Sequence, residues 1–139
     1  MSQEFATPQD AEDAYYDAIE DGDLSAMLAV WETSDDVVCL LPMQPLVQGH
    51  GKIREAWGPL LQSDVKVDIE VLHFHWIEAG DLAIHYLREK VNIPDQPQQQ
   101  PPIYATNIYR KDGSGWHMIL HQNSPAAPPP GMMPGMPPQ

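Results

Sequence analysis

Apolar residues recur three or four positions apart in the first part of the chain and at every second position in the rest. The first spacing predicts helices over residues 8–21, 23–31 and 50–62. The second predicts a meander of long strands that begins near residue 65 and ends near 123, after short strands near 37–41 and 46–49. This order is typical of an α+β domain in which three helices pack on one face of a curved, mostly antiparallel sheet.

The first predicted helix has clear boundaries. Thr7 suits the N-cap, and Pro8 suits the first helical position, where its missing N–H costs nothing. Gly22 is expected to end this helix, and Asp23 to cap the next one. Helical spacing assigns one set of acidic residues to the side away from the apolar stripe: Glu12, Asp13, Asp17 and Glu20.

Strict alternation along residues 65–77 places His73 and His75 on one face of a strand, and Phe74 and Trp76 on the other. Residues 78–81 and 112–115 are expected to be hairpin turns, and the Pro-rich residues 94–102 a loop. We expect one domain over 1–124. Residues 125–139 are rich in Pro, Met and Gly without any charge, which predicts a disordered tail.

The composition excludes several classes of protein. The net charge is −13, and no Lys or Arg precedes Lys52, so the chain is not expected to bind nucleic acid. No apolar run is long enough to span a membrane, and the N-terminus lacks the basic start of a signal peptide. A single cysteine, Cys39, lies in an apolar run and is expected to be a buried structural residue. These features predict a cytoplasmic protein that binds no membrane.

Three stretches resemble the nuclear transport factor 2-like superfamily, in particular its SnoaL-like and ketosteroid isomerase-like branch. They are Gly22-Asp23-Leu24-Ser25-Ala26-Met27-Leu28-Ala29-Val30-Trp31, Leu46-Val47-Gln48-Gly49 with Ile53-Arg54-Glu55-Ala56-Trp57, and Ala105-Thr106-Asn107-Ile108-Tyr109 with Gly115-Trp116-His117-Met118-Ile119-Leu120-His121. The resemblance covers residues 8–125. It implies a cone-shaped, cystatin-like fold with a pocket between helices and sheet, and a homodimer formed through the opposite sheet face.

The resemblance to ketosteroid isomerase also carries over individual positions. Tyr15 stands where that enzyme has a tyrosine that holds the substrate oxygen, and Asn107 stands where it has a protonated aspartate. Both side chains are still able to donate hydrogen bonds to a carbonyl oxygen. The position of the catalytic carboxylate is occupied by Leu41, so steroid isomerisation by that mechanism is disfavoured.

A different base is therefore needed, and histidine suits proton transfer near neutral pH. His75, His85 and His121 are candidates, with His121 taken together with Tyr15 and Asn107 as the catalytic set. The alternative is that these histidines are structural. A His73-x-His75 pair also suggests a metal, but a metal site needs a third ligand on the same face, such as His85, Glu89 or His121, and the pair alone is a weak signal. Neither a metal nor a cofactor is therefore expected.

The pocket is expected to be lined by Trp31, Trp57, Leu41, His75, His85 and Tyr109. Two functions remain open at this point. The protein either binds a small apolar carbonyl compound and acts as a cofactor-free isomerase, cyclase or dehydratase, or it is a non-catalytic module that binds a ligand or a partner.

Overall fold

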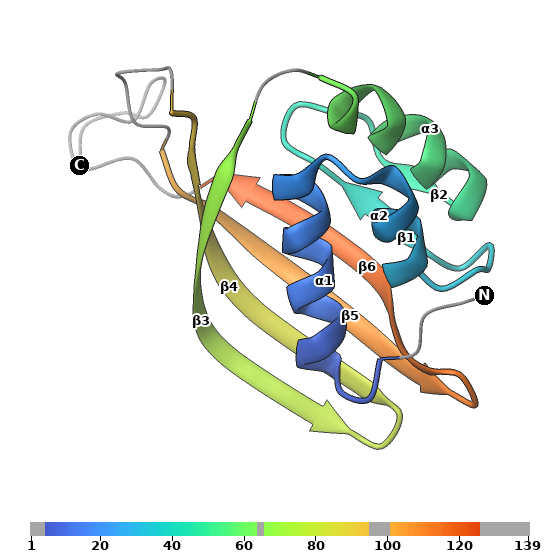
Figure 1. Ribbon diagram of the computed structural model, residues 1–139. Helices are drawn as coiled ribbons and strands as arrows, with labels where there is room; N and C mark the ends of the chain where they lie inside the picture. Colours follow the sequence, from blue (N-terminus) through green and yellow to red (C-terminus); the bar gives the residue numbers. More distant parts are fainter. Residues whose placement is uncertain (1–4, 64–65, 95–100, 126–139) are drawn as a thin grey trace, which may run out of the picture.

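A computed structural model describes residues 5–63, 66–94 and 101–125 (Figure 1). Within them the helices and strands follow the predicted order: α1 Pro8–Asp21, α2 Leu24–Val30, β1 Val38–Leu40, β2 Val47–Gln48, α3 His50–Leu61, β3 Asp68–Ala79, β4 Leu82–Asn92, β5 Ile103–Asp112 and β6 Gly115–Pro125. The α+β class and the three helices are confirmed.

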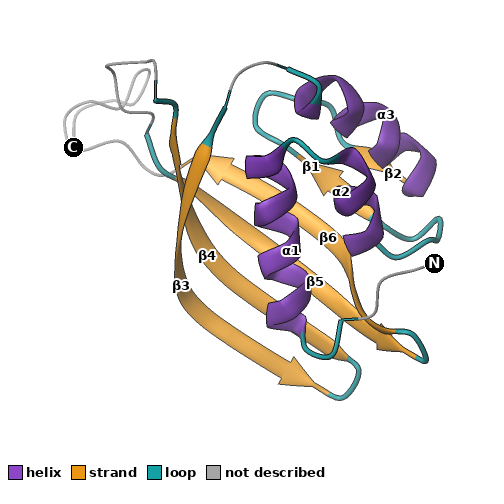
Figure 2. Ribbon diagram, in the orientation of Figure 1, coloured by secondary structure: helices purple, strands orange, loops and turns teal. Residues whose placement is uncertain are grey.

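The strands form one sheet in the order β2-β1-β6-β5-β4-β3. Neighbouring strands run antiparallel except β1 and β6, which run parallel. Figure 2 shows α1 lying across one face of the curved sheet, with α2 and α3 beside it toward the β1 and β2 end. The opposite face of the long strands carries no helix among the described residues.

The ends of α1 are set by the expected residues. The Thr7 hydroxyl accepts a hydrogen bond from the backbone N–H of Asp10 at 3.0 Å. Gly22 ends the helix in the left-handed region with φ of 64°, and a Cβ there would lie 3.0 Å from the Leu61 carbonyl oxygen. The carboxylate of Asp23 then caps α2 by accepting from the backbone N–H of Ala26. These caps fix how α1 lies on the sheet.

The face of α1 that meets the sheet is wider than the apolar stripe predicts. Ala11, Tyr15 and Ala18 are buried as expected, but Glu12 and Tyr16 are buried too. Glu12 is only 1% exposed, so its assignment to the solvent side of the helix was wrong. In the fold, Glu12 points toward polar side chains of the sheet, and its contacts with them explain why it is buried. Helical spacing alone does not reveal these contacts.

Strand β3 contains a bulge that overturns the predicted alternation. The pairing with β4 shifts between His73 and His75, so His75 lies opposite the exposed Tyr86, while Trp76 lies opposite the buried His85. His73 and Trp76 therefore share the face toward α1, and their rings lie 4.8 Å apart. His75 is exposed on the other face, so its predicted place in the pocket was wrong.

Part of the prediction lies outside the described residues. Most of the Pro-rich loop, residues 95–100, and the tail from 126 onward belong to these segments, and β6 extends to Pro125, one residue into the expected tail. Within the described ranges, no helix has both the length and the apolar character needed to cross a membrane.

Candidate functional site

A group of buried polar side chains lies between α1 and the strands β3 to β6. They are joined by hydrogen bonds and comprise Glu12, Tyr16, His73, His85, Glu89, Asn107, Tyr109, His121 and Asn123. We call this group the polar network. Buried polar groups are costly unless they are paired, and these hydrogen bonds pair them.

One end of the polar network is centred on Glu12. Its Oε2 accepts hydrogen bonds from Tyr109 Oη at 2.8 Å, His85 Nδ1 at 2.9 Å and Asn107 Nδ2 at 3.1 Å, and its Oε1 contacts His73 Nε2. Burial raises the pKa of this carboxyl, but the hydrogen bonds from His85 and His73 outweigh it and lower the pKa to about 2. Glu12 is therefore an anion at neutral pH.

The other end is centred on Glu89 of β4. Its Oε2 accepts from Tyr16 Oη at 2.7 Å, and its Oε1 accepts from Asn123 Nδ2 at 2.9 Å. The Nε2 atom of His121 lies 3.9 Å from Oε2. Fewer donors thus surround this carboxylate than surround Glu12.

Asn107 and His121 connect the two ends. Asn107 donates through Nδ2 to Glu12 and to Tyr16 Oη, so its Oδ1 is the atom that faces His121 Nδ1, at 2.5 Å. Asn123 donates through Nδ2 to Glu89 and to the Tyr104 carbonyl oxygen, so its Oδ1 faces His121 Nε2, at 2.8 Å. Both ring nitrogens therefore lie at hydrogen-bonding distance from an amide oxygen.

This arrangement changes the chemistry open to His121. A ring nitrogen that donates to an amide oxygen has no lone pair with which to take a proton from a ligand. The predicted use of His121 as a general base thus requires its hydrogen bonds to rearrange.

A cavity of about 520 Å³ opens beside the Glu89 end. Its walls are largely apolar, and its polar lining comes mainly from Tyr15, Glu89, His121 and Asn123. The remaining lining residues are Ile19, Leu41, Pro42, Gln44, Trp57, Leu60, Val67, Ile69, Val91, Ile93 and Ile103. The cavity therefore combines an apolar wall with a small polar patch, as small-molecule sites commonly do.

Trp57 lines the cavity with a buried indole Nε1 that has no hydrogen-bond partner among the described residues. Tyr15 also lines the cavity and is 1% exposed, and its hydroxyl has no hydrogen-bond partner in the parts of the chain that the structure describes. Burial, with smaller contributions from the nearby Cys39 and Glu89, raises the pKa of this phenol well above its usual value. Tyr15 therefore stays protonated and offers a free donor.

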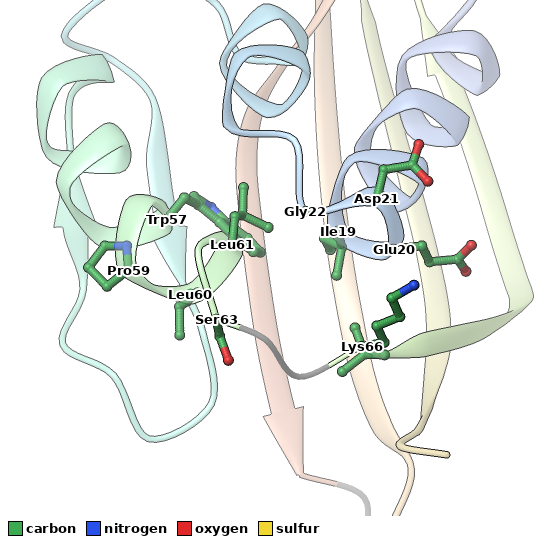
Figure 3. A pocket seen from close by; sticks show the side chains of 11 residues that line it. Ile19, Glu20, Asp21, Gly22, Trp57, Pro59, Leu60, Leu61, Ser63 and Lys66 are labelled. Atoms are coloured by element: carbon green, nitrogen blue, oxygen red, sulfur yellow. The ribbon is translucent and has the colours of Figure 1, made fainter. Parts of the chain in front are cut away.

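A groove of about 490 Å³ adjoins this cavity and shares Ile19, Trp57, Leu60 and Val67 with it. Figure 3 shows the groove between the C-terminal ends of α1 and α3, with Glu20 and Lys66 on one side and Trp57 on the other. The shared residues make the two hollows neighbouring parts of one depression, which leads from the surface toward Tyr15.

The residues singled out in the sequence fall into several groups. Tyr15, Trp57, Leu41 and His121 line the cavity. Asn107, His85 and Tyr109 belong to the polar network but do not line the cavity, and Trp31 is packed in the core. Cys39 is buried, and burial raises the pKa of its thiol to about 12, which makes it unreactive as expected.

The sequence reasoning missed Glu12, Tyr16 and Asn123 as site residues and considered Glu89 only as a metal ligand. For Glu89 a signal existed, because it continues the alternation of Ala83, His85 and Leu87 on β4. Asn123 likewise follows His121 at the next inward position of β6. Nothing comparable marked Glu12, whose neighbours Asp13 and Asp17 are exposed acids.

The fold has relatives among solved structures. A candidate calcium/calmodulin-dependent protein kinase type II association domain from Thiobacillus denitrificans is 35% identical, with a TM-score of 0.82 over 88% of this chain and 98% of that one. A candidate dehydratase of the nuclear transport factor 2-like family from Streptomyces avermitilis is 25% identical, with a TM-score of 0.76 over 85% of this chain and 92% of that one.

A ketosteroid isomerase-like protein from Erwinia carotovora shares the fold at 19% identity, with a TM-score of 0.66 over 86% of this chain and 94% of that one. Among curated proteins, the F-box protein SKIP8 of Arabidopsis thaliana is 24% identical over 119 residues. That match covers 79% of this chain and 46% of SKIP8, so this chain spans about half the length of that relative.

The sequence profile of the SnoaL-like domain matches residues 9–128, nearly all of the part that forms helices and strands. The chain belongs to the SnoaL-like domain family, within the nuclear transport factor 2-like superfamily.

Proposed function

We propose that the protein binds a small, largely apolar molecule in the cavity beside Glu89, and that an oxygen of this molecule accepts a hydrogen bond from Tyr15. The observation that carries the proposal is the Tyr15 hydroxyl, which makes no hydrogen bond to the described residues and belongs to a residue that lines the cavity. This oxygen is not among the fully buried side-chain atoms that lack a partner, so a ligand carbonyl in the cavity can accept its hydrogen bond.

The size and lining of the cavity support this ligand class. A volume of about 520 Å³ falls in the range of sites for small organic molecules. Leu41, Val91 and Ile103 supply apolar wall, while the few polar groups are concentrated near Tyr15. A ligand with an apolar body and one carbonyl or similar oxygen matches this distribution better than a sugar or a phosphate ester.

The finer proposal is catalysis of proton transfer without a cofactor, as in an isomerase, a cyclase or a dehydratase. Glu89 lines the cavity and is the basic group that replaces the carboxylate missing at Leu41. Tyr15 would stabilise charge on the ligand oxygen. The names of two similar proteins, a candidate dehydratase and a ketosteroid isomerase-like protein, favour this chemistry.

The test is a thermal-shift screen with small apolar ketones, enones and phenols, followed by calorimetric titration of the best compound. We expect Tyr15→Phe to weaken binding about five- to tenfold, the worth of one hydrogen bond of about 1 kcal/mol. Tyr86→Phe is the matched control, because Tyr86 is exposed on the other face of the sheet. Equal affinity in wild type and Tyr15→Phe, or no stabilising compound in the screen, would contradict the proposal.

A second candidate is a binding module that assembles through the outer face of the sheet. Phe74, Tyr86 and Tyr104 form a cluster of aromatic rings there, with centroids 5.9 to 6.1 Å apart, and Leu72 is 47% exposed. Exposed apolar patches of this kind commonly mark protein interfaces. A similar protein is named as an association domain, which supports the same interpretation.

We propose a homodimer as the occupant of this face. Light scattering coupled to gel filtration is expected to give twice the chain mass of 15.6 kDa for the wild type and the monomer mass for Phe74→Glu. Glu55→Lys on α3, away from the cluster, serves as the control charge change. A wild-type monomer at high micromolar concentration would overturn the dimer.

A further inference from the structure

We propose that Glu12, His73 and His85 form a binding site for one divalent transition-metal ion. One carboxylate oxygen and one nitrogen from each ring all lie within 4.8 Å of one another. Carboxylate and imidazole are ligands that zinc and ferrous ions accept together, at about 2.0–2.2 Å for zinc. Ligand atoms at these distances from one ion are about 3 to 4 Å apart, so small side-chain movements would close the site.

The three ligands come from three different elements, and the bulge in β3 is what brings them together. By shifting the pairing after His73, the bulge removes His75 from this face and puts Trp76 in its place. Trp76 stacks on His85 with ring centroids 4.8 Å apart and a 22° angle, and its ring meets that of His73 edge to face. The two imidazoles are thus held in position by the same indole.

Hydrogen bonds from the sheet also fix the orientation of the Glu12 carboxylate. Tyr109 Oη and Asn107 Nδ2 both donate to Glu12 Oε2, whereas Oε1 faces His73. Groups that hydrogen-bond a ligating carboxylate fix its orientation, and they are a regular part of metal sites. Tyr109 and Asn107 can keep these bonds while Oε1 binds an ion, whereas the contacts of His73 and His85 with the carboxylate would be replaced by bonds to the ion.

An approach path for a cation is present. Glu12 and His73 lie in a groove of about 310 Å³ between α1 and β3, and His73 has a side-chain exposure of 22%. The other charged residues that line this groove are Asp13, Asp17 and Glu20, so it holds acidic side chains and no Lys or Arg. Such a groove attracts cations and repels anions. This opening is distinct from the cavity beside Tyr15, and the two hollows share only Ile69.

The test is calorimetric titration of the full chain with Zn²⁺ and with Co²⁺, whose visible absorption reports its ligand set. We expect one ion per chain, and at least tenfold weaker binding in His73→Ala. His73 is the ligand to change because it is half-exposed, so its loss leaves the fold intact, which circular dichroism checks. His75→Ala is the matched control, two positions away on the opposite face, and is expected to bind the ion like the wild type.

Several results would overturn the site: no binding of either ion, equal affinity in His73→Ala and wild type, or an equal loss in His75→Ala. Binding that survives in Tyr15→Phe would support a metal site that is independent of the ligand cavity. This last comparison separates the two proposals, because the cavity needs Tyr15 and the metal site does not.

Discussion

Glu12 and Glu89 are two buried carboxylates of one polar network, yet their surroundings differ. Glu12, on helix α1, accepts hydrogen bonds from side chains of β4 and β5 and contacts His73 of β3. Glu89, on β4, accepts from Tyr16 and Asn123 and also lines the cavity. One carboxylate is enclosed by donors from the sheet, and the other keeps a side toward the space where a ligand would bind.

The difference separates a structural anion from a reactive one. Many donors around Glu12 lower its pKa to about 2, so this group would not take up a proton near neutral pH. Asn107 links the two, because it donates to Glu12 and its carbonyl oxygen accepts from His121, which lies beside Glu89. Glu12 thereby helps to orient Asn107, which contacts the His121 ring beside Glu89.

The largest effect is expected from Glu12→Gln. The glutamine amide removes the charge and turns an NH₂ group toward side chains that themselves donate, so it leaves buried donors without acceptors. Losing one partner of a buried charged group costs about 3 to 5 kcal/mol. We expect the free energy of unfolding, measured with urea, to fall by about 3 kcal/mol or more.

Asp17→Asn is the control for this substitution, because Asp17 lies on the same helix but is exposed. Its effect is expected to stay within about 0.5 kcal/mol, as for most surface substitutions. Equal, small effects of both substitutions would show that Glu12 does not anchor the polar network.

Low pH is expected to destabilise the fold through protonation of the same carboxylate, that of Glu12. The pKa of Glu12 is lowered in the folded protein from 4.5 to about 2, so its contribution is complete above pH 4.5 and is lost as the pH falls toward 2. One pKa unit corresponds to about 1.4 kcal/mol, which makes the full loss about 3 kcal/mol. Urea titrations at several pH values should show a shallower acid dependence in Glu12→Gln. Parallel curves for the two proteins would contradict the assigned pKa.

The fold was predictable because its local signals agree with one another. Thr7, Pro8, Gly22 and Asp23 mark helix ends through their own side chains and backbone preferences, and the structure uses each of them in that way. Alternating apolar residues predicted the long strands, and the curved, mostly antiparallel sheet follows from their order. These features depend on residues close together in the sequence.

The site was only partly predictable, since it depends on contacts between distant elements. Tyr15 and Asn107 were found by resemblance, and His121 was chosen as a candidate proton carrier. His121 contacts both, through a hydrogen bond with Asn107 and a ring contact with Tyr15. The spacing on α1 predicted an exposed Glu12, because only the donors of β3, β4 and β5 explain its burial. The bulge at Phe74 likewise cannot be recognised from the alternation of apolar and polar residues in the sequence. His75 was therefore predicted on the wrong face of the sheet.

Glu89→Gln is expected to have a smaller effect on stability than Glu12→Gln. Glutamine keeps one oxygen that can accept from Tyr16 or Asn123, so we expect a loss of about 1 to 2 kcal/mol in the same urea titration. If the cavity catalyses proton transfer, turnover of any substrate found in the ligand screen should drop about 10²- to 10⁴-fold. Retained turnover in Glu89→Gln would exclude Glu89 as the base.

The smallest effects on stability are expected from substitutions of two adjacent tyrosines, Tyr15 and Tyr16. These substitutions compare a hydroxyl bonded to the polar network with one that faces the cavity. The Tyr16 hydroxyl donates to Glu89 and accepts from Asn107, so Tyr16→Phe removes two bonds of the polar network and is expected to cost about 1 to 2 kcal/mol. The Tyr15 hydroxyl has no partner among the described residues, so Tyr15→Phe is expected to change stability by less than about 0.5 kcal/mol, or to stabilise slightly.

Both substitutions remove one oxygen from equally placed rings on α1, and their rings pack edge to face at 4.8 Å, so packing changes are matched. Ligand affinity should show the opposite order, with Tyr15→Phe weaker and Tyr16→Phe closer to the wild type. This opposite order of the effects on stability and on ligand affinity is expected only if the Tyr16 hydroxyl bonds to the protein and the Tyr15 hydroxyl bonds to a ligand. A larger stability loss in Tyr15→Phe than in Tyr16→Phe would mean that the Tyr15 hydroxyl serves the fold, which would remove the donor on which the proposed ligand site depends.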